Sequence, residues 1–124
     1  MQKLPPSRFF PPAETADEDG LLAVGGSLSP EWLLDAYSHG IFPWPVAEVD
    51  NPVFWWSLDP RAILELDGLR VSRRLWRTIR GDRFQVTRDR DFGGVIAGCA
   101  TGPGREGSTW ITPRMPRVSI GLIL

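Results

Sequence analysis

Proline and glycine interrupt this chain so often that it cannot form long regular elements. Its 124 residues include 12 prolines and 13 glycines. Proline removes a backbone donor and glycine loosens the backbone, so both end helices and strands and favour turns. The sequence therefore predicts short helices and strands joined by ordered loops, in one modest domain or in a small domain followed by part of another.

The first half predicts a strand, a helix and a second strand. An apolar run closed by two glycines at residues 20–26 indicates a buried strand or a tight turn. A Ser-Pro pair at 29–30 fits the start of a helix that ends at Gly40. Residues 41–45 place prolines on both sides of an aromatic and predict an ordered loop, and the bulky run at 53–56 predicts a strand.

The second half predicts further short elements, which are identified by alternating apolar residues, caps and glycines. They are a strand at 62–66 with Ile63 and Leu64 buried, a helix at 73–80 capped by Ser72, a strand at 84–87, a helix at 92–100, a glycine-rich turn at 101–107 and a strand at 108–112. This order indicates a mixed fold, which we assign to the α+β class. Residues 1–59 are expected to form a small N-terminal lobe, and residues 60–124 to open a second domain.

Charge is distributed unevenly although the net charge is only −1. Residues 1–59 carry two basic and nine acidic side chains, whereas residues 60–124 carry twelve arginines and six acids. An acidic half followed by a basic half suggests two faces with different partners. The alternative is ordinary variation between solvated surfaces.

Several classes of protein are disfavoured by what the chain contains. No apolar run follows the first basic residues, as a secretory signal would require, and no stretch approaches the roughly 20 apolar residues of a membrane span. His39 and Cys99 are the single histidine and the single cysteine, so no zinc spacing exists. We expect His39 to complement a helix end and Cys99 to be a small buried hydrophobe. A cytoplasmic protein without metal or catalytic cysteine is predicted.

The helix expected at 73–80 carries a concentrated positive charge. Arg73, Arg74, Arg77 and Arg80 fall within about a third of its circumference, at the helical period. Leu75 and Ile79 lie opposite and are expected to pack inward. A nucleic-acid backbone would neutralise the four arginines and release counterions. The alternatives are a solvated basic face or pairing with the acidic lobe.

Six tryptophans are many for a chain of this length, and Trp44 stands apart because prolines flank it in an expected loop. A rigid, partly exposed indole beside a basic surface suits stacking on a base or on an apolar side chain. From spacing alone, a tryptophan that staples the loop to the core is equally compatible with the sequence.

Several runs of this chain resemble the leucyl/phenylalanyl-tRNA–protein transferase family, in the order and near the spacing of that family. The resemblance covers about residues 10–114. The runs are GLLAVGGSLSP at 20–30, GIFPW at 40–44, WWSLDPR at 55–61, VSR at 71–73, FQVT at 84–87, VIAGCA at 95–100 and GSTWIT at 107–112.

The resemblance implies a bacterial cytoplasmic enzyme of the N-degron pathway, with no metal or other cofactor. Such enzymes transfer leucine or phenylalanine from aminoacyl-tRNA to a protein whose N-terminal residue is Lys or Arg. The implied fold is a small lobe followed by a GNAT-like (acetyltransferase-like) domain, here residues 60–124 in incomplete form, and the implied state is a monomer. By motif position, Trp44 and Trp110 match the aromatic residues of the donor pocket, and Arg73, Arg77 and Arg80 match the basic helix that meets the acceptor stem.

Residues 113–124 match nothing that we recognise in the family, which suggests a truncated or frameshifted reading. In the family, the Asp, Gln and Glu residues proposed to act on the acceptor amine lie downstream, so no catalytic residue is assigned here. This chain alone is therefore expected to be inactive. The alternatives are a non-catalytic tRNA-binding remnant and a protein-interaction module that uses its aromatic surface.

Overall fold

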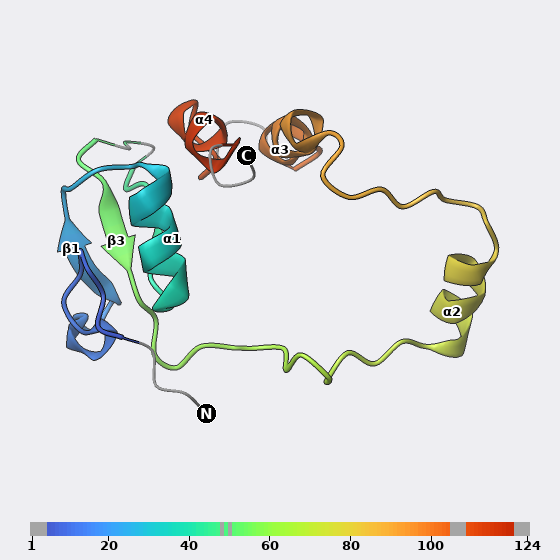
Figure 1. The fold of residues 1–124 in the computed structure, drawn as a ribbon, viewed down its shortest axis with the longest axis horizontal. Coiled ribbons are helices and arrows are strands. Elements are labelled where there is room, and N and C mark those ends of the chain that lie inside the picture. The colour runs from blue at the N-terminus through green and yellow to red at the C-terminus, as the bar shows by residue number, and fades with distance from the viewer. Residues whose placement is uncertain (1–4, 48, 50, 105–108, 121–124) are drawn as a thin grey trace. The chain divides into compact units, whose positions relative to one another are not determined.

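The computed structural model describes residues 5–47, 49, 51–104 and 109–120 (Figure 1). The chain divides into two units, which are described separately. Unit 1 comprises residues 1–59 and 91–124, and unit 2 comprises residues 60–90. Among the described residues, unit 1 contains a three-stranded sheet and three α-helices, and unit 2 contains one helix. The α+β class is thus confirmed.

The sheet of unit 1 is antiparallel, with strand order β1-β3-β2. Its strands are β1 (Leu21–Val24), β2 (Phe42–Pro43) and β3 (Phe54–Trp56), and β3 is central. Strands form near 20–26 and at 53–56 as expected, but β1 is not buried: its first three residues are half-buried and Val24 is exposed. The expected loop at 41–45 is wrong in part, because Phe42 and Pro43 pair with β3. Pro43 can lie there because β2 is an edge strand.

Helix α1 (Pro30–Ser38) forms as the sequence predicts. The Ser29 hydroxyl accepts a hydrogen bond from the Trp32 N–H at 3.5 Å, and Pro30 occupies the first turn. The chain leaves the helix through Gly40, whose φ of 72° lies in the left-handed region. This exit carries the chain directly into β2.

The core of unit 1 lies between α1 and the sheet. Leu33 and Ala36 of α1 and Trp55 of β3 are all fully buried. The Trp55 Nε1–H donates to the Gly25 carbonyl at 2.9 Å, so the buried indole leaves no polar atom unpaired. Phe10 packs edge-on against Trp55, with ring centroids 4.7 Å apart, and so joins the N-terminal segment to the core.

The end of the chain returns to unit 1 through α3 (Phe92–Thr101) and α4 (Arg114–Ile120). The helix expected at 92–100 is confirmed, and its N-cap Asp91 accepts from the Gly94 N–H at 3.0 Å. Two expectations are wrong. Cys99 is exposed, because α3 turns Ile96 and Ala100 toward the core instead.

The second wrong expectation is a strand at 108–112. The described residues 109–112 form no strand, because the Thr112 carbonyl begins the turn into α4 by accepting from the Met115 N–H at 3.0 Å. Residues 105–108, which include part of the expected glycine-rich turn and the start of that strand, lie outside the described residues.

Unit 2 consists of α2 (Arg73–Arg80) with irregular chain and turns on both sides. The predicted cap is confirmed, since the Ser72 hydroxyl accepts from the Leu75 N–H at 3.2 Å. The strands expected at 62–66 and 84–87 are absent, because a strand needs a hydrogen-bonded neighbour and the described residues of unit 2 supply none.

The expected burial of apolar side chains in unit 2 is also wrong. Ile63 and Leu64 are exposed, and so are Leu75 and Ile79, because unit 2 has no second described element against which they could pack. No helix within the described part of the chain is long and apolar enough to cross a membrane.

Candidate functional site

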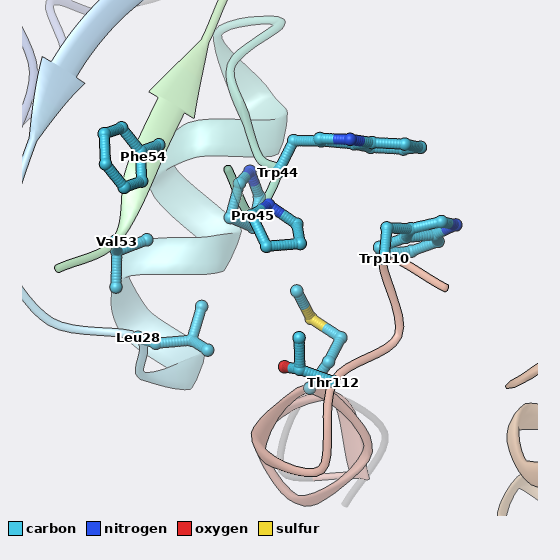
Figure 2. Close-up of a pocket in the computed structure, with 9 residues that line it drawn as sticks. Leu28, Trp44, Pro45, Val53, Phe54, Trp110 and Thr112 are labelled. Carbon is cyan, nitrogen blue, oxygen red and sulfur yellow. The ribbon is translucent and has the colours of Figure 1, made fainter. Parts of the chain in front are cut away.

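Two tryptophans that are far apart in the sequence meet in unit 1. The rings of Trp44 and Trp110 are stacked, with centroids 5.4 Å apart and an interplanar angle of 17° (Figure 2). The sequence resemblance assigned both residues to one pocket, and the structure does bring them together. Trp44 is 47% exposed, so the stack lies at the surface.

Backbone hydrogen bonds hold Trp44 where β2 ends. Its N–H donates to the Phe54 carbonyl at 3.0 Å, and its carbonyl accepts from the Trp56 Nε1–H at 3.0 Å. Pro43 and Pro45 fix the backbone on both sides. The Trp44 indole is therefore held at the surface by a rigid loop and is not buried in the core.

Trp110 is positioned by the segment that leads into α4. The Ile111 N–H donates to the Thr109 hydroxyl at 3.1 Å. Ile111 and Met115 are both buried in the core of unit 1. Burial of the next side chain along the backbone fixes the direction of Trp110, which is itself half-buried.

A small apolar pocket lies beside the two indoles. Its volume is about 10 Å³, close to the space that one water molecule needs. Its lining consists of both tryptophans with Leu28, Pro43, Pro45, Val53, Phe54, Thr112 and Met115. In this state the indoles occupy one another's stacking faces, so a flat ligand can enter between them only if they separate.

The lining defines what this pocket can do chemically. Indole faces and aliphatic groups bind flat rings and apolar side chains. Thr112 is the single hydrogen-bonding side chain in the lining besides the indole N–H groups, and no lining residue is ionisable in the physiological range. The pocket is suited to binding, and its own residues supply no general acid or base.

A second candidate site lies within unit 2, on α2. Arg73, Arg77 and Arg80 line one hollow of about 410 Å³ together with Trp76. The Arg80 guanidinium carbon lies 5.1 Å from the centroid of the Trp76 ring. None of the three arginines has an acidic partner among the residues that the structure describes. The predicted basic face is therefore present and unneutralised within unit 2.

Trp76 is a residue of this site that the sequence analysis did not single out. A signal was available, because Trp76 precedes Arg80 by four positions and follows Arg73 by three, which are helical neighbours. An indole among three guanidinium groups adds a stacking surface to an electrostatic one.

His39 has the structural role that was expected for it, with more partners than a helix end provides. Its Nδ1 lies 2.7 Å from the Asp35 carbonyl oxygen, and its Nε2 lies 2.8 Å from the Pro5 carbonyl oxygen. These two carbonyls raise the pKa of His39 above its ordinary value, and the nearby Asp35 carboxylate adds to the effect. No group of three or more potential metal ligands exists in the part of the chain that the structure describes.

Comparison with known proteins identifies relatives for most of the chain. Residues 26–59 match the family model described as the leucyl/phenylalanyl-tRNA protein transferase N-terminal domain, and residues 63–123 match the model described as leucyl/phenylalanyl-tRNA protein transferase. The expectation that the resemblance ends after Thr112 is therefore wrong. The second match runs to residue 123, which removes the observation that suggested a frameshift.

Individual relatives give the same result. The chain is 53% identical over 117 residues to a leucyl/phenylalanyl-tRNA–protein transferase of Anaeromyxobacter sp. (strain Fw109-5). The aligned region covers 93% of this chain and 48% of that protein. It is 56% identical over 109 residues to the protein of that name from Maridesulfovibrio salexigens, covering 86% of this chain and 44% of the relative. The chain thus spans about half the length of the curated relatives it matches.

Proposed function

This chain belongs to the leucyl/phenylalanyl-tRNA–protein transferase family, and we propose that it supplies the part of such an enzyme that binds the aminoacyl-tRNA donor. The proposed reaction transfers leucine or phenylalanine from its tRNA to the N-terminal Lys or Arg of an acceptor protein. The stacked pair of Trp44 and Trp110 beside an apolar pocket is the observation that carries this proposal.

The pocket suits the chemistry of the donor end. An aminoacyl-tRNA ends in an adenosine esterified to the amino acid, so it offers a flat base next to an apolar side chain when the amino acid is leucine or phenylalanine. Indole faces stack on bases without reading their sequence. Aliphatic lining groups such as Leu28 and Val53 favour an apolar side chain over a polar one.

The arginines of α2 suit the rest of the tRNA. Arg73, Arg77 and Arg80 share one face and have no acidic partner among the described residues, so phosphates of the acceptor stem would neutralise them. Trp76 within the same hollow can stack on an exposed base or a ribose face.

In the proposed reaction, the acceptor's α-amine attacks the ester carbonyl of the donor. A C–N bond forms, the ester C–O bond breaks, and the ribose oxygen leaves with a proton, while the amine loses one. The lining of the Trp44–Trp110 pocket holds no group that could move these protons. We therefore assign donor binding to this chain and expect it to be inactive alone. The proposed enzyme is cytoplasmic and monomeric. In it, residues 1–59 form a lobe and residues 60–124 begin a GNAT-like domain. No metal or other cofactor is part of the proposal.

Transfer of labelled leucine from Leu-tRNA to a protein beginning with Arg tests the proposal. We expect no transfer by this chain alone, and transfer when the remaining half of a relative is added. Transfer by the chain alone would overturn the assignment of proton movement to other residues. Binding of Leu-tRNA without transfer in either case would instead favour a non-catalytic tRNA-binding remnant.

A further inference from the structure

One buried polar atom in the Trp44–Trp110 pocket has no partner. Thr112 is 7% exposed, and its hydroxyl oxygen forms no hydrogen bond with any described residue. A buried hydroxyl without a partner is destabilising, and folded proteins rarely retain one without a reason.

The local backbone does not use this hydroxyl. Thr112 stands just before α4, where a threonine side chain often caps the free N–H groups of a helix. Here the Thr112 carbonyl, and not its hydroxyl, accepts from the Met115 N–H. The helix start is thus made without the side chain, which leaves the hydroxyl available to something else.

The hydroxyl belongs to the wall of the pocket. Thr112 lines it among apolar groups that include Leu28, Val53 and Met115. Figure 2 shows Thr112 on the side of the pocket away from Trp44, with Trp110 to one side of both. A ligand whose flat face stacks on the indoles would therefore turn an edge toward Thr112.

We propose that the Thr112 hydroxyl is a ligand-binding group that forms a hydrogen bond with a polar edge of the donor's terminal nucleoside. This inference rests on the proposed function. The nucleoside has a stacking face and hydrogen-bonding edges, which match two indoles and one hydroxyl. The pocket now has space for only about one water molecule. A nucleoside can therefore reach the hydroxyl only after Trp44 and Trp110 separate.

Two substitutions separate the hydroxyl from the rest of the side chain. Thr112→Val keeps the shape and removes the hydroxyl, whereas Thr112→Ser keeps the hydroxyl and removes the methyl group. The probe is the non-hydrolysable 3′-amide analogue of phenylalanyl-adenosine, and its Kd is measured by titration calorimetry on the 124-residue chain. We expect about a tenfold weaker Kd for Thr112→Val and a change of less than about threefold for Thr112→Ser.

Thermal unfolding without ligand gives a second readout. Because the hydroxyl has no partner in the unliganded protein, Thr112→Val should keep or raise the Tm, whereas a hydroxyl with a structural role would give a lower Tm. Unchanged Kd for Thr112→Val, with Trp110→Ala weakening the probe, would overturn the inference and leave the proposed function standing. Failure of the unsubstituted chain to bind the probe would overturn both.

Discussion

At the scale of single residues, His39 and Asp35 fasten the N-terminal segment to α1. The Asp35 carboxylate accepts from the Ser7 hydroxyl at 2.6 Å and from the Phe9 N–H at 3.3 Å. Burial alone would raise the pKa of Asp35, but these hydrogen bonds, one from the Arg8 N–H and the charge of His39 together lower it. Both ring nitrogens of His39 face carbonyl oxygens, and both can donate only when the ring is charged.

This arrangement predicts how stability depends on pH. The pKa of His39 is raised in the folded state, so its contribution is fully present below about pH 6.5, the unfolded value, and is lost as pH rises through the folded pKa. The pKa of Asp35 is lowered, so its contribution is present above its unfolded value of 3.8 and is lost as pH falls through the folded pKa. The combined contribution of His39 and Asp35 to the free energy of unfolding is therefore largest between about pH 4 and 6.5.

Urea unfolding of the unsubstituted chain and of His39→Asn from pH 5 to 8 measures this effect. We expect the free energy of unfolding to fall across this range in the former and to change much less in the variant. His39 is the single histidine, so its proton NMR signals give the folded pKa directly. A folded pKa at or below 6.5 would contradict the prediction.

Gly25 and Gly26 form a matched pair for a test of packing. Both have positive φ, 100° and 76°, which strains any other residue. A Cβ at Gly26 would collide with the Trp32 ring, whereas a Cβ at Gly25 has no atom within 4 Å. We expect Gly25→Ala to cost about 1–2 kcal/mol in the free energy of unfolding, and Gly26→Ala about 1–3 kcal/mol more. Equal costs in chemical denaturation would show that Trp32 moves aside freely.

At the scale of elements, α2 is the part whose proposed role depends on charge. Its arginines should bind phosphate, so the affinity for tRNA should fall steeply with salt. Replacing Arg73, Arg77 and Arg80 together by Gln should weaken binding and lower the slope of log K against log salt by roughly two to three units. Filter binding from low to moderate salt measures this slope.

Arg74 provides the control for that experiment, because it lies on α2 but does not line the hollow with the other three. Arg74→Gln should leave the slope essentially unchanged, whereas loss of one arginine that contacts phosphate would lower it by about 0.9 units. If the triple variant kept the slope of the unsubstituted chain, α2 would not be the phosphate-binding element.

The stacked indoles predict a spectroscopic signal for ligand entry. Their transitions couple at a centroid separation of 5.4 Å, which should give an exciton couplet in the circular dichroism spectrum that Trp110→Phe removes. A base held between two rings needs planes about 7 Å apart, twice the usual carbon contact distance, so the adenosine probe should diminish the couplet. Trp32 and Trp55 form a second close pair, at 5.9 Å, whose signal should not respond. Binding with the couplet intact would show that the ligand sits outside the stack.

The sequence predicted those elements that depend on local signals. Ser29 with Pro30, Ser72 and Asp91 mark helix starts that the structure contains, because a cap acts within one turn. The strands expected around Ile63 and Phe84 are absent, because strand formation depends on a partner that no local pattern reveals. The pairing of Trp44 with Trp110 followed from resemblance, and spacing alone left Trp44 undecided between the core and the surface.

At the scale of the whole molecule, the two units differ in how much they bury. Unit 1 encloses a core around Leu33 and Trp55, whereas the described residues of unit 2 include no fully buried side chain. Leu66 and Val86 are among its most exposed apolar residues. The proposal that residues 60–124 form one domain after a lobe of 1–59 stays a prediction.

This difference predicts a sharp contrast in local stability between two helices of similar length. α1 buries Leu33 and Ala36 completely, whereas α2 buries nothing, and an isolated helix of eight residues is marginal in water. Backbone amides of residues 60–90 should therefore exchange with solvent nearly as fast as in an unfolded chain, while those of α1 and β3 exchange only through larger openings. Hydrogen-exchange mass spectrometry resolves both segments in one experiment. Slow exchange across residues 73–80 would mean that α2 packs against another surface, and dilution would tell whether that surface belongs to a second copy of the chain.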